Sequence, residues 1–140
     1  ILGLNKFPKV YLPSGKIRVL KNRIKYYLLL VKPNFGCSTR KVFSANKVFS
    51  KSKLGKLKNV SKTMIINSEN DLENSAFRLY PNLFKLKNKL LSWKKAEFVR
   101  MTGSGSTLVM YFNKEVSAKN ALKMSKRKLN NCWCILSKVI

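Results

Sequence analysis

The sequence predicts an α+β domain of the ferredoxin-like split βαβ type, with extra helices inserted in the first crossover. Three observations lead to this fold class. Apolar residues make up 45% of the 140 residues, enough for the buried core of one domain. From residue 25 onward, short apolar runs alternate with segments of helical spacing. Their order is strand, helices, strand, strand, helix and strand, as in that fold.

The first 24 residues predict two short strands before the domain. Within them, YLPSGKIRVL (residues 11–20) predicts a short strand, a Pro-Ser-Gly turn and a second strand. The run KYYLLLVKP then predicts a buried strand over residues 25–31. Pro33 stops it, because proline cannot pair within a central strand. We therefore expect the domain itself to span residues 25–140.

The first crossover is expected to begin with a helix and a loop. Ser38 is a suitable N-cap for that helix. Residues 50–62 are rich in lysine and predict a mobile loop. The apolar face of the helix would hold Val42, Phe43, Ala45, Val48 and Phe49.

Two further helices are expected before the next strand. Asn70 would be the N-cap of the first, and Glu73 stands three residues later, at the spacing of a capping box. Pro81 suits the first turn of the second helix. That helix repeats Leu83, Leu86 and Leu90 at helical spacing, with Phe84 and Leu91 beside them.

The last third of the sequence predicts a hairpin, a helix and a final strand. Strands over 96–101 and 107–112 are joined by a loop of hairpin length that contains two glycines. Asn113 would cap a helix that reaches about Lys128, and the turn and strand lie in NNCWCILSKVI. The face of this helix that packs on the sheet is expected to contain Ala118, Ala121, Leu122 and Ser125.

The chain is strongly basic, with 30 Lys and Arg against 5 acids and a net charge of +25. One interpretation is a coding bias towards lysine, spread over a solvated surface. The other is a nucleic-acid binder that displaces counterions from phosphates. No RNA-recognition signature is present, and Tyr111 and Phe112 should lie on opposite faces of their strand without a paired aromatic platform. Nucleic acid is therefore the less favoured partner.

Composition also bears on metals and on location. The sequence has no histidine, and the three cysteines, Cys37, Cys132 and Cys134, lack the spacing of a zinc site or of a dense disulfide framework. Free thiols fit a reducing cytosol. The longest apolar run, residues 26–31, is too short to span a bilayer. We expect a cytoplasmic protein without a metal site or a membrane partner.

The loop in MTGSGSTLVMYF (residues 101–112) could bind a phosphate or serve only as a turn. It lacks the lysine and the glycine spacing of a P-loop. Leu108 stands where a dinucleotide fingerprint needs its third glycine. Glycines nevertheless allow backbone amides to approach a ligand, and consecutive amides can form an anion-binding nest. The pattern alone leaves both interpretations open.

Three stretches, in order, resemble the GHMP small-molecule kinases. They are LLVKPNFGCSTRKVF (29–43), NDLENSAFRLYPNLFKLKNKLL (70–91) and VRMTGSGSTLVMYF (99–112), the last of which looks like the third conserved motif of that family. The resemblance covers the chain from about residue 25 to its end and implies the C-terminal ferredoxin-like domain, with residues 1–24 as the junction that follows an N-terminal domain. It also implies transfer of the ATP γ-phosphate, with Mg²⁺, to the 2-hydroxyl of a cytidine diphosphate-linked erythritol of the non-mevalonate isoprenoid route.

The resemblance also implies roles for particular residues. The loop that supports the ATP phosphates would be Gly103, Ser104, Gly105, Ser106 and Thr107. Phe43 would stack on the cytosine ring, and Ser38 and Thr39 would approach the substrate. Each has a structural alternative: Phe43 could be a core residue, and Ser38 and Thr39 could only cap a helix. Helix capping also accounts for Asn70, Asp71 and Glu73.

The family's other motifs are absent from the chain. Neither the Gly-Leu-Gly-x-Ser-Ser ATP loop nor the Gly-Ala-Asp-x-Pro segment with the catalytic aspartate occurs. We therefore expect no catalytic residue in this chain, and activity only together with an N-terminal domain. A basic RNA-binding domain and a non-catalytic fragment are the alternatives.

Overall fold

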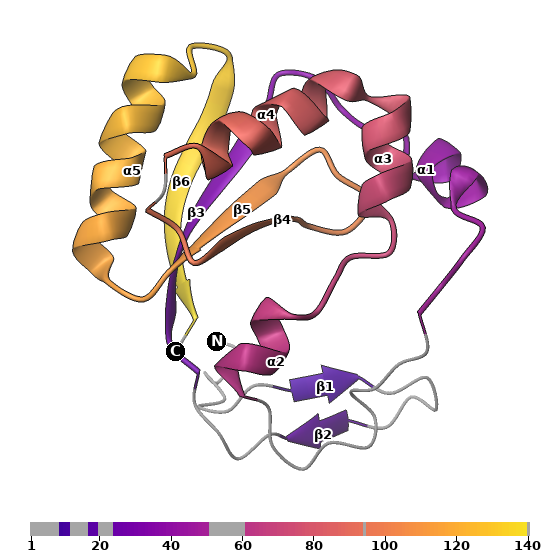
Figure 1. The fold of residues 1–140 in the computed structure, drawn as a ribbon, viewed down its shortest axis with the longest axis horizontal. Coiled ribbons are helices and arrows are strands. Elements are labelled where there is room, and N and C mark those ends of the chain that lie inside the picture. Colours follow the sequence, from indigo (N-terminus) through magenta and orange to yellow (C-terminus); the bar gives the residue numbers. More distant parts are fainter. Residues whose placement is uncertain (1–8, 12–16, 20–23, 51–60, 94, 140) are drawn as a thin grey trace, which may run out of the picture.

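The main element of the fold is a four-stranded antiparallel sheet with the strand order β4-β5-β3-β6 (Figure 1). The computed structural model describes residues 9–11, 17–19, 24–50, 61–93 and 95–139. The strands are β3 (Tyr26–Pro33), β4 (Phe98–Met101), β5 (Leu108–Phe112) and β6 (Cys132–Val139). This order, with helices between β3 and β4 and between β5 and β6, confirms the predicted fold class.

A separate antiparallel pair precedes this sheet. It consists of β1 (Lys9–Tyr11) and β2 (Ile17–Val19), with Val10 opposite Arg18. The second strand lies where the sequence predicted it, whereas the first lies slightly earlier. The predicted Pro-Ser-Gly turn, residues 13–15, lies outside the described residues.

The core lies between one face of the sheet and two helices. Side chains alternate along the strands, so Leu29 and Val31 of β3 point to the same face as Met110 and Phe112 of β5. Helices α4 (Pro81–Leu91) and α5 (Glu115–Lys128) cover this face. They contribute fully buried side chains, among them Leu83, Leu90, Ala118 and Ala121.

Helix α1 (Thr39–Ala45) ends before the last residues of the predicted apolar face, Val48 and Phe49. Asn46 ends it, because its N–H bonds the carbonyl of Phe43 and its side-chain amide donates to the carbonyl of Val48 at 2.8 Å. The expectation of one apolar face was therefore wrong: Val42 is buried, but Val48 and Phe49 follow the helix and are exposed.

Two short helices follow before α4. Helix α2 (Lys62–Ile66) is capped by Ser61, whose hydroxyl accepts from the amide of Met64 at 3.2 Å. Residues 51–60 of the predicted lysine-rich loop lie outside the described residues. Helix α3 (Glu73–Leu79) leads directly into α4, where Pro81 occupies the first turn as predicted.

Helix α5 agrees with its prediction in length and in buried face, but not in its N-cap. Lys114, not Asn113, is the capping residue, and it forms no side-chain cap bond. The side-chain oxygen of Asn113 instead accepts from the Lys62 ammonium group. Glu115 in the first turn and basic residues in the last turn complement the helix dipole.

The opposite face of the sheet carries an aromatic cluster that the sequence interpretation missed. The rings of Phe98 and Tyr111 stack with centroids 4.1 Å apart, and Tyr26 packs edge-on against both. Tyr111 and Phe112 do point to opposite faces, but Tyr111 has its aromatic partner on β4 rather than on its own strand. Because Tyr26 is buried and the other two rings cover each other, the cluster is packed structure and not an open stacking platform.

No helix in the described part of the chain is long and apolar enough to cross a membrane.

Candidate phosphate-binding loop

The glycine loop is the turn between β4 and β5, as the sequence predicted. The amide of Thr102 donates to the carbonyl of Thr107 at 3.0 Å, and the amide of Gly105 donates to the carbonyl of Thr102 at 3.1 Å. Gly103 and Gly105 both have positive φ, +55° and +89°. Only glycine adopts this conformation without steric cost, which explains both glycines.

Gly105 is also required because there is no room for a side chain at this position. A Cβ atom at this position would lie 2.9 Å from the sulfur of Met101 and 3.1 Å from that of Cys37. It would also meet the side chain of Leu83 at 3.4 Å. The loop backbone therefore rests directly on the core, whereas Gly103 has nothing within 4 Å of its own Cβ position.

Side chains tie the loop to the segment that follows β3. The hydroxyl of Ser106, which is only 4% exposed, donates to the carbonyl of Phe35 at 2.7 Å. The hydroxyls of Thr39 and Ser104 lie 2.9 Å apart in a hydrogen bond. The structure thus brings Thr39 and the loop together, although they lie 65 residues apart in the sequence.

The N-terminal end of α1 holds the other predicted substrate residues. The Ser38 hydroxyl accepts from the amide of Lys41, so the capping interpretation of Ser38 is confirmed. The amide of Ser38 also donates to the Tyr80 hydroxyl at 2.8 Å. Phe43 is 48% exposed, so the alternative that it belongs to the core is wrong.

The capping box expected from Asn70 and Glu73 is not formed, and Asp71 does not cap α3. The N-cap of α3 is Leu72, whose own side chain forms no cap bond, although the Asn70 side-chain oxygen accepts from the amide of Leu72 at 3.1 Å. Asp71 accepts from the amide and the hydroxyl of Ser50, at 2.8 and 3.0 Å. Asn70 and Glu73 instead contact β4 and the glycine loop. A capping box needs the Glu73 side chain to accept from the backbone N–H of Asn70. Here the Glu73 carboxylate accepts from Met101 and Lys87 instead.

Sequence reasoning also missed the contributions of Tyr80 and Cys37. The Tyr80 hydroxyl positions the start of α1. Cys37 packs beside the Gly105 backbone. Burial raises the pKa of the Cys37 thiol, so it is uncharged at neutral pH. No local pattern marks either residue, because their partners lie far away in the sequence.

The donors of the loop fit a phosphate group. The hydroxyls of Thr39 and Ser104 lie on or beside it, whereas the Ser106 hydroxyl already donates its proton to the carbonyl of Phe35 and so anchors the loop. Among the described residues, no acceptor pairs with the backbone N–H of Gly103, Ser104 or Ser106. Such amides and hydroxyls can bind an anion without any acid–base chemistry. No group of three His, Cys, Asp or Glu side chains that could hold a metal ion occurs in the described parts of the chain.

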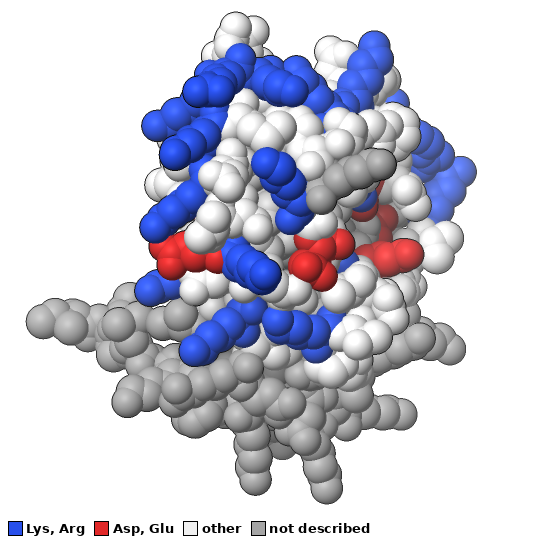
Figure 2. Space-filling model, turned by 60° about the vertical axis from the view of Figure 1, so that its left-hand side comes forward, with Lys and Arg blue, Asp and Glu red and all other residues white. Residues whose placement is uncertain are grey.

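The surrounding charge favours anions, but it is not confined to the loop. On the face shown in Figure 2, Lys and Arg side chains are spread widely, and the acidic side chains lie in a band across its middle. The two ion pairs of the described structure join Lys87 to Glu73 and Lys119 to Glu115. A net charge of +25 raises the local concentration of any anionic ligand.

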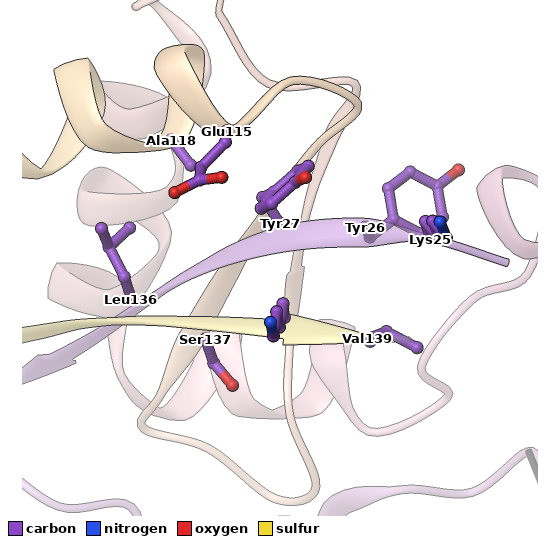
Figure 3. Close-up of a pocket in the computed structure, with 9 residues that line it drawn as sticks. Lys25, Tyr26, Tyr27, Glu115, Ala118, Leu136, Ser137 and Val139 are labelled. Carbon is purple, nitrogen blue, oxygen red and sulfur yellow. The ribbon is translucent and has the colours of Figure 1, made fainter. Parts of the chain in front are cut away.

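A hollow of about 560 Å³ lies at the other end of the sheet (Figure 3). Tyr27 of β3 and Leu136 of β6 line it, together with Glu115 and Ala118 of α5. Tyr27 pairs with Phe112, whereas the glycine loop adjoins Leu108 at the far end of β5. None of the loop residues lines this hollow.

The fold and the anchored glycine loop agree with the C-terminal domain of a small-molecule kinase. The family model "GHMP kinases C terminal" matches residues 48–131. The chain belongs to the GHMP kinase family and corresponds to the C-terminal domain of that family.

The relatives point to one kind of kinase within that family. The chain is 42% identical over 142 residues to 4-diphosphocytidyl-2-C-methyl-D-erythritol kinase of Pelagibacter ubique, covering 100% of this chain and 50% of that protein. The chloroplastic enzyme of the same name from Arabidopsis thaliana is 34% identical over 89 residues, covering 59% of this chain and 23% of that protein. The chain spans about half the length of the Pelagibacter relative.

A solved structure shows the same fold. The crystal structure of a 4-(cytidine 5'-diphospho)-2C-methyl-D-erythritol kinase matches with a TM-score of 0.66 and 21% identity. The match covers 87% of this chain and 46% of that one. At this identity the likeness bears on the fold alone.

Proposed function

We propose that this chain is the C-terminal part of an ATP-dependent kinase that phosphorylates 4-diphosphocytidyl-2-C-methyl-D-erythritol, with residues 1–24 as the junction to an N-terminal domain. The observation that carries the proposal is the glycine loop, whose donors are presented by a domain of the GHMP kinase family. The names of the relatives supply the substrate. The three free cysteines support a cytoplasmic location.

In this proposal the chain binds and orients, and it supplies no catalytic acid or base. The amides of residues 103–107 and the hydroxyls of Ser104 and Thr107 bind the ATP phosphates and hold them against the N-terminal domain, while the Ser106 hydroxyl anchors the loop to the carbonyl of Phe35. ATP supplies the phosphoryl group when it is bound. The described residues fit phosphate oxygens, but they contain no cluster of acids for Mg²⁺, so no metal ligand is assigned to this chain.

The substrate side of the proposal rests on α1. Phe43 is 48% exposed, so its ring is a candidate for stacking on a cytosine. Thr39 is the first residue of this helix and connects it to the loop, because its hydroxyl bonds that of Ser104. Ser38 and Thr39 therefore stand where a substrate on α1 and a phosphate on the loop could both be reached.

A chimera tests the proposal. The N-terminal half of the Pelagibacter ubique kinase is joined to this chain, and ATP-dependent phosphorylation of the cytidine diphosphate substrate is measured. Turnover is the expected result. A well-folded chimera without turnover would contradict the proposal.

Phe43→Ala in the same chimera tests the stacking role. It should raise KM for the cytidine substrate about tenfold, since base–aromatic stacking is worth about 1–3 kcal/mol. KM for ATP should stay unchanged. The matched control is Phe49→Ala, another exposed phenylalanine, located after α1. Equal KM values in both variants would remove the stacking role from Phe43.

A further inference from the structure

The side chain of Asn70 makes three hydrogen bonds, and two of them go to the glycine hairpin. Its side-chain nitrogen donates to the carbonyl of Met101 at 2.9 Å and to that of Gly103 at 2.8 Å. Its side-chain oxygen accepts from the amide of Leu72 at 3.1 Å. A side-chain amide has two N–H donors and one carbonyl oxygen, so both donors and the oxygen of Asn70 are hydrogen-bonded.

Glu73 contacts the same strand. One carboxylate oxygen accepts from the amide of Met101 at 2.8 Å, and the other accepts from the Lys87 ammonium at 2.8 Å. Glu73 and Lys87 are both largely buried, with side chains 16% and 18% exposed. The ion pair therefore holds the carboxylate in place against the strand.

Together the two side chains replace a neighbouring strand. Strand β4 is at the edge of the sheet, so the N–H and C=O of Met101 that point away from β5 have no backbone partner there. Glu73 takes the N–H and Asn70 takes the C=O of this one residue. Asn70 then continues to Gly103, the first glycine of the loop.

We infer that Asn70 and Glu73 are positioning residues for the glycine loop, acting through the backbone of Met101 and Gly103. This inference rests on the proposed function for its catalytic meaning, since the loop would hold the ATP phosphates. A displacement of about 1 Å in a positioning element can cost on the order of 100-fold in rate. The side chains that cover the edge of β4 thus also set where the loop amides lie.

The probe variant is Asn70→Asp in the chain of 140 residues. It has nearly the same shape and keeps an acceptor for the Leu72 amide, but it removes both donors to the hairpin. Asn120→Asp is the matched control. Asn120 is exposed in the middle of α5, and its replacement adds the same negative charge. A second variant, Glu73→Gln, keeps an oxygen for Met101 and loses the ion pair with Lys87.

The first measurement is amide hydrogen exchange of each variant. Asn70→Asp should speed exchange at least fivefold at Thr102 and Gly105, whose amides close the hairpin. Exchange at Leu29 in the central strand should stay within twofold of the wild type. Glu73→Gln should show its largest change at Met101. Unchanged exchange in the hairpin, or equal acceleration in the core, would overturn the inference.

The second measurement uses the chimera with the Pelagibacter kinase. Asn70→Asp should lower kcat/KM for ATP at least tenfold and leave KM for the cytidine substrate within twofold, whereas Asn120→Asp should change neither. An equal rise in both KM values, or no change in either, would refute the positioning role. A chimera that is inactive with the wild-type sequence counts against the proposed function, and hydrogen exchange then decides the positioning inference by itself.

Discussion

Replacing Gly105 by alanine tests how closely the loop backbone rests on the core. The new Cβ atom would lie 2.9 Å from the sulfur of Met101 and 3.1 Å from the sulfur of Cys37. Real Cβ atoms essentially never approach other heavy atoms within 3.0 Å, so a neighbour has to move. The φ of +89° adds backbone strain for any residue other than glycine.

The magnitude follows from these two contributions. Positive φ costs an L-residue about 1–2 kcal/mol, and one extra methyl group in a packed core costs about 1–3 kcal/mol. The lower entropy of the unfolded alanine chain returns about 0.4–1 kcal/mol. Gly105→Ala should therefore lower the free energy of unfolding by about 1–5 kcal/mol. Gly103→Ala, with open space around its Cβ position, should cost about 1 kcal/mol or less.

Urea unfolding of the two variants and the wild type measures the difference. With an m-value of about 1.5 kcal/mol/M, the midpoint for Gly105→Ala should fall by about 0.7–3 M. The midpoint for Gly103→Ala should fall by well under ~1 M. Gly36→Ala is a further control, since Gly36 has neither positive φ nor a neighbour within 4 Å. Equal midpoints for the Gly103 and Gly105 variants would refute the packing argument.

Two further predictions concern the outer face of the sheet. Arg100→Met should lower the free energy of unfolding by about 1 kcal/mol and speed amide exchange in α2, because Arg100 donates to the carbonyls of the last residues of that helix at 3.0 and 3.2 Å; unchanged exchange in α2 would contradict this role. Burial, and then the nearby Glu97 carboxylate, raises the pKa of Tyr26 above its usual 10.0, so the stability that depends on the neutral phenol is present below pH 10 and is lost as the pH rises through the raised pKa. Tyr26→Phe should therefore move the alkaline unfolding midpoint to higher pH, and superimposable alkaline unfolding curves would exclude this cause.

The sequence determined the order and type of most elements, because their signals are local. The apolar run of β3, the proline at the start of α4 and the two glycines between β4 and β5 each indicate a structure without reference to distant residues. Alternation of period two and helical spacing then assigned buried faces, and Leu83, Leu90, Ala118 and Ala121 are buried as predicted. The resemblance to the GHMP kinases rested on the same stretches.

Local signals failed where a side chain had a choice of partners. Asn113 and Asn70 both stand before helices and are suitable caps by type. Asn113 bonds the distant Lys62 instead, and Asn70 uses its side-chain nitrogen for distant carbonyls and only its oxygen for the nearby Leu72 amide. The apolar residues after Asn46 continue a helical pattern, yet the amide of Asn46 ends the helix before they are reached. An apolar residue such as Phe43 gives no sign in the sequence of whether it is buried or exposed.

The sequence by itself therefore determined the fold class, the family and the hairpin that carries the glycine loop. The tertiary structure decided how the loop is held and what surrounds it. Thr39 lies 65 residues from Ser104, and Asn70 lies 31 residues from Met101. Hydrogen bonds over such separations depend on where the folded chain brings two groups together, and no local spacing encodes that.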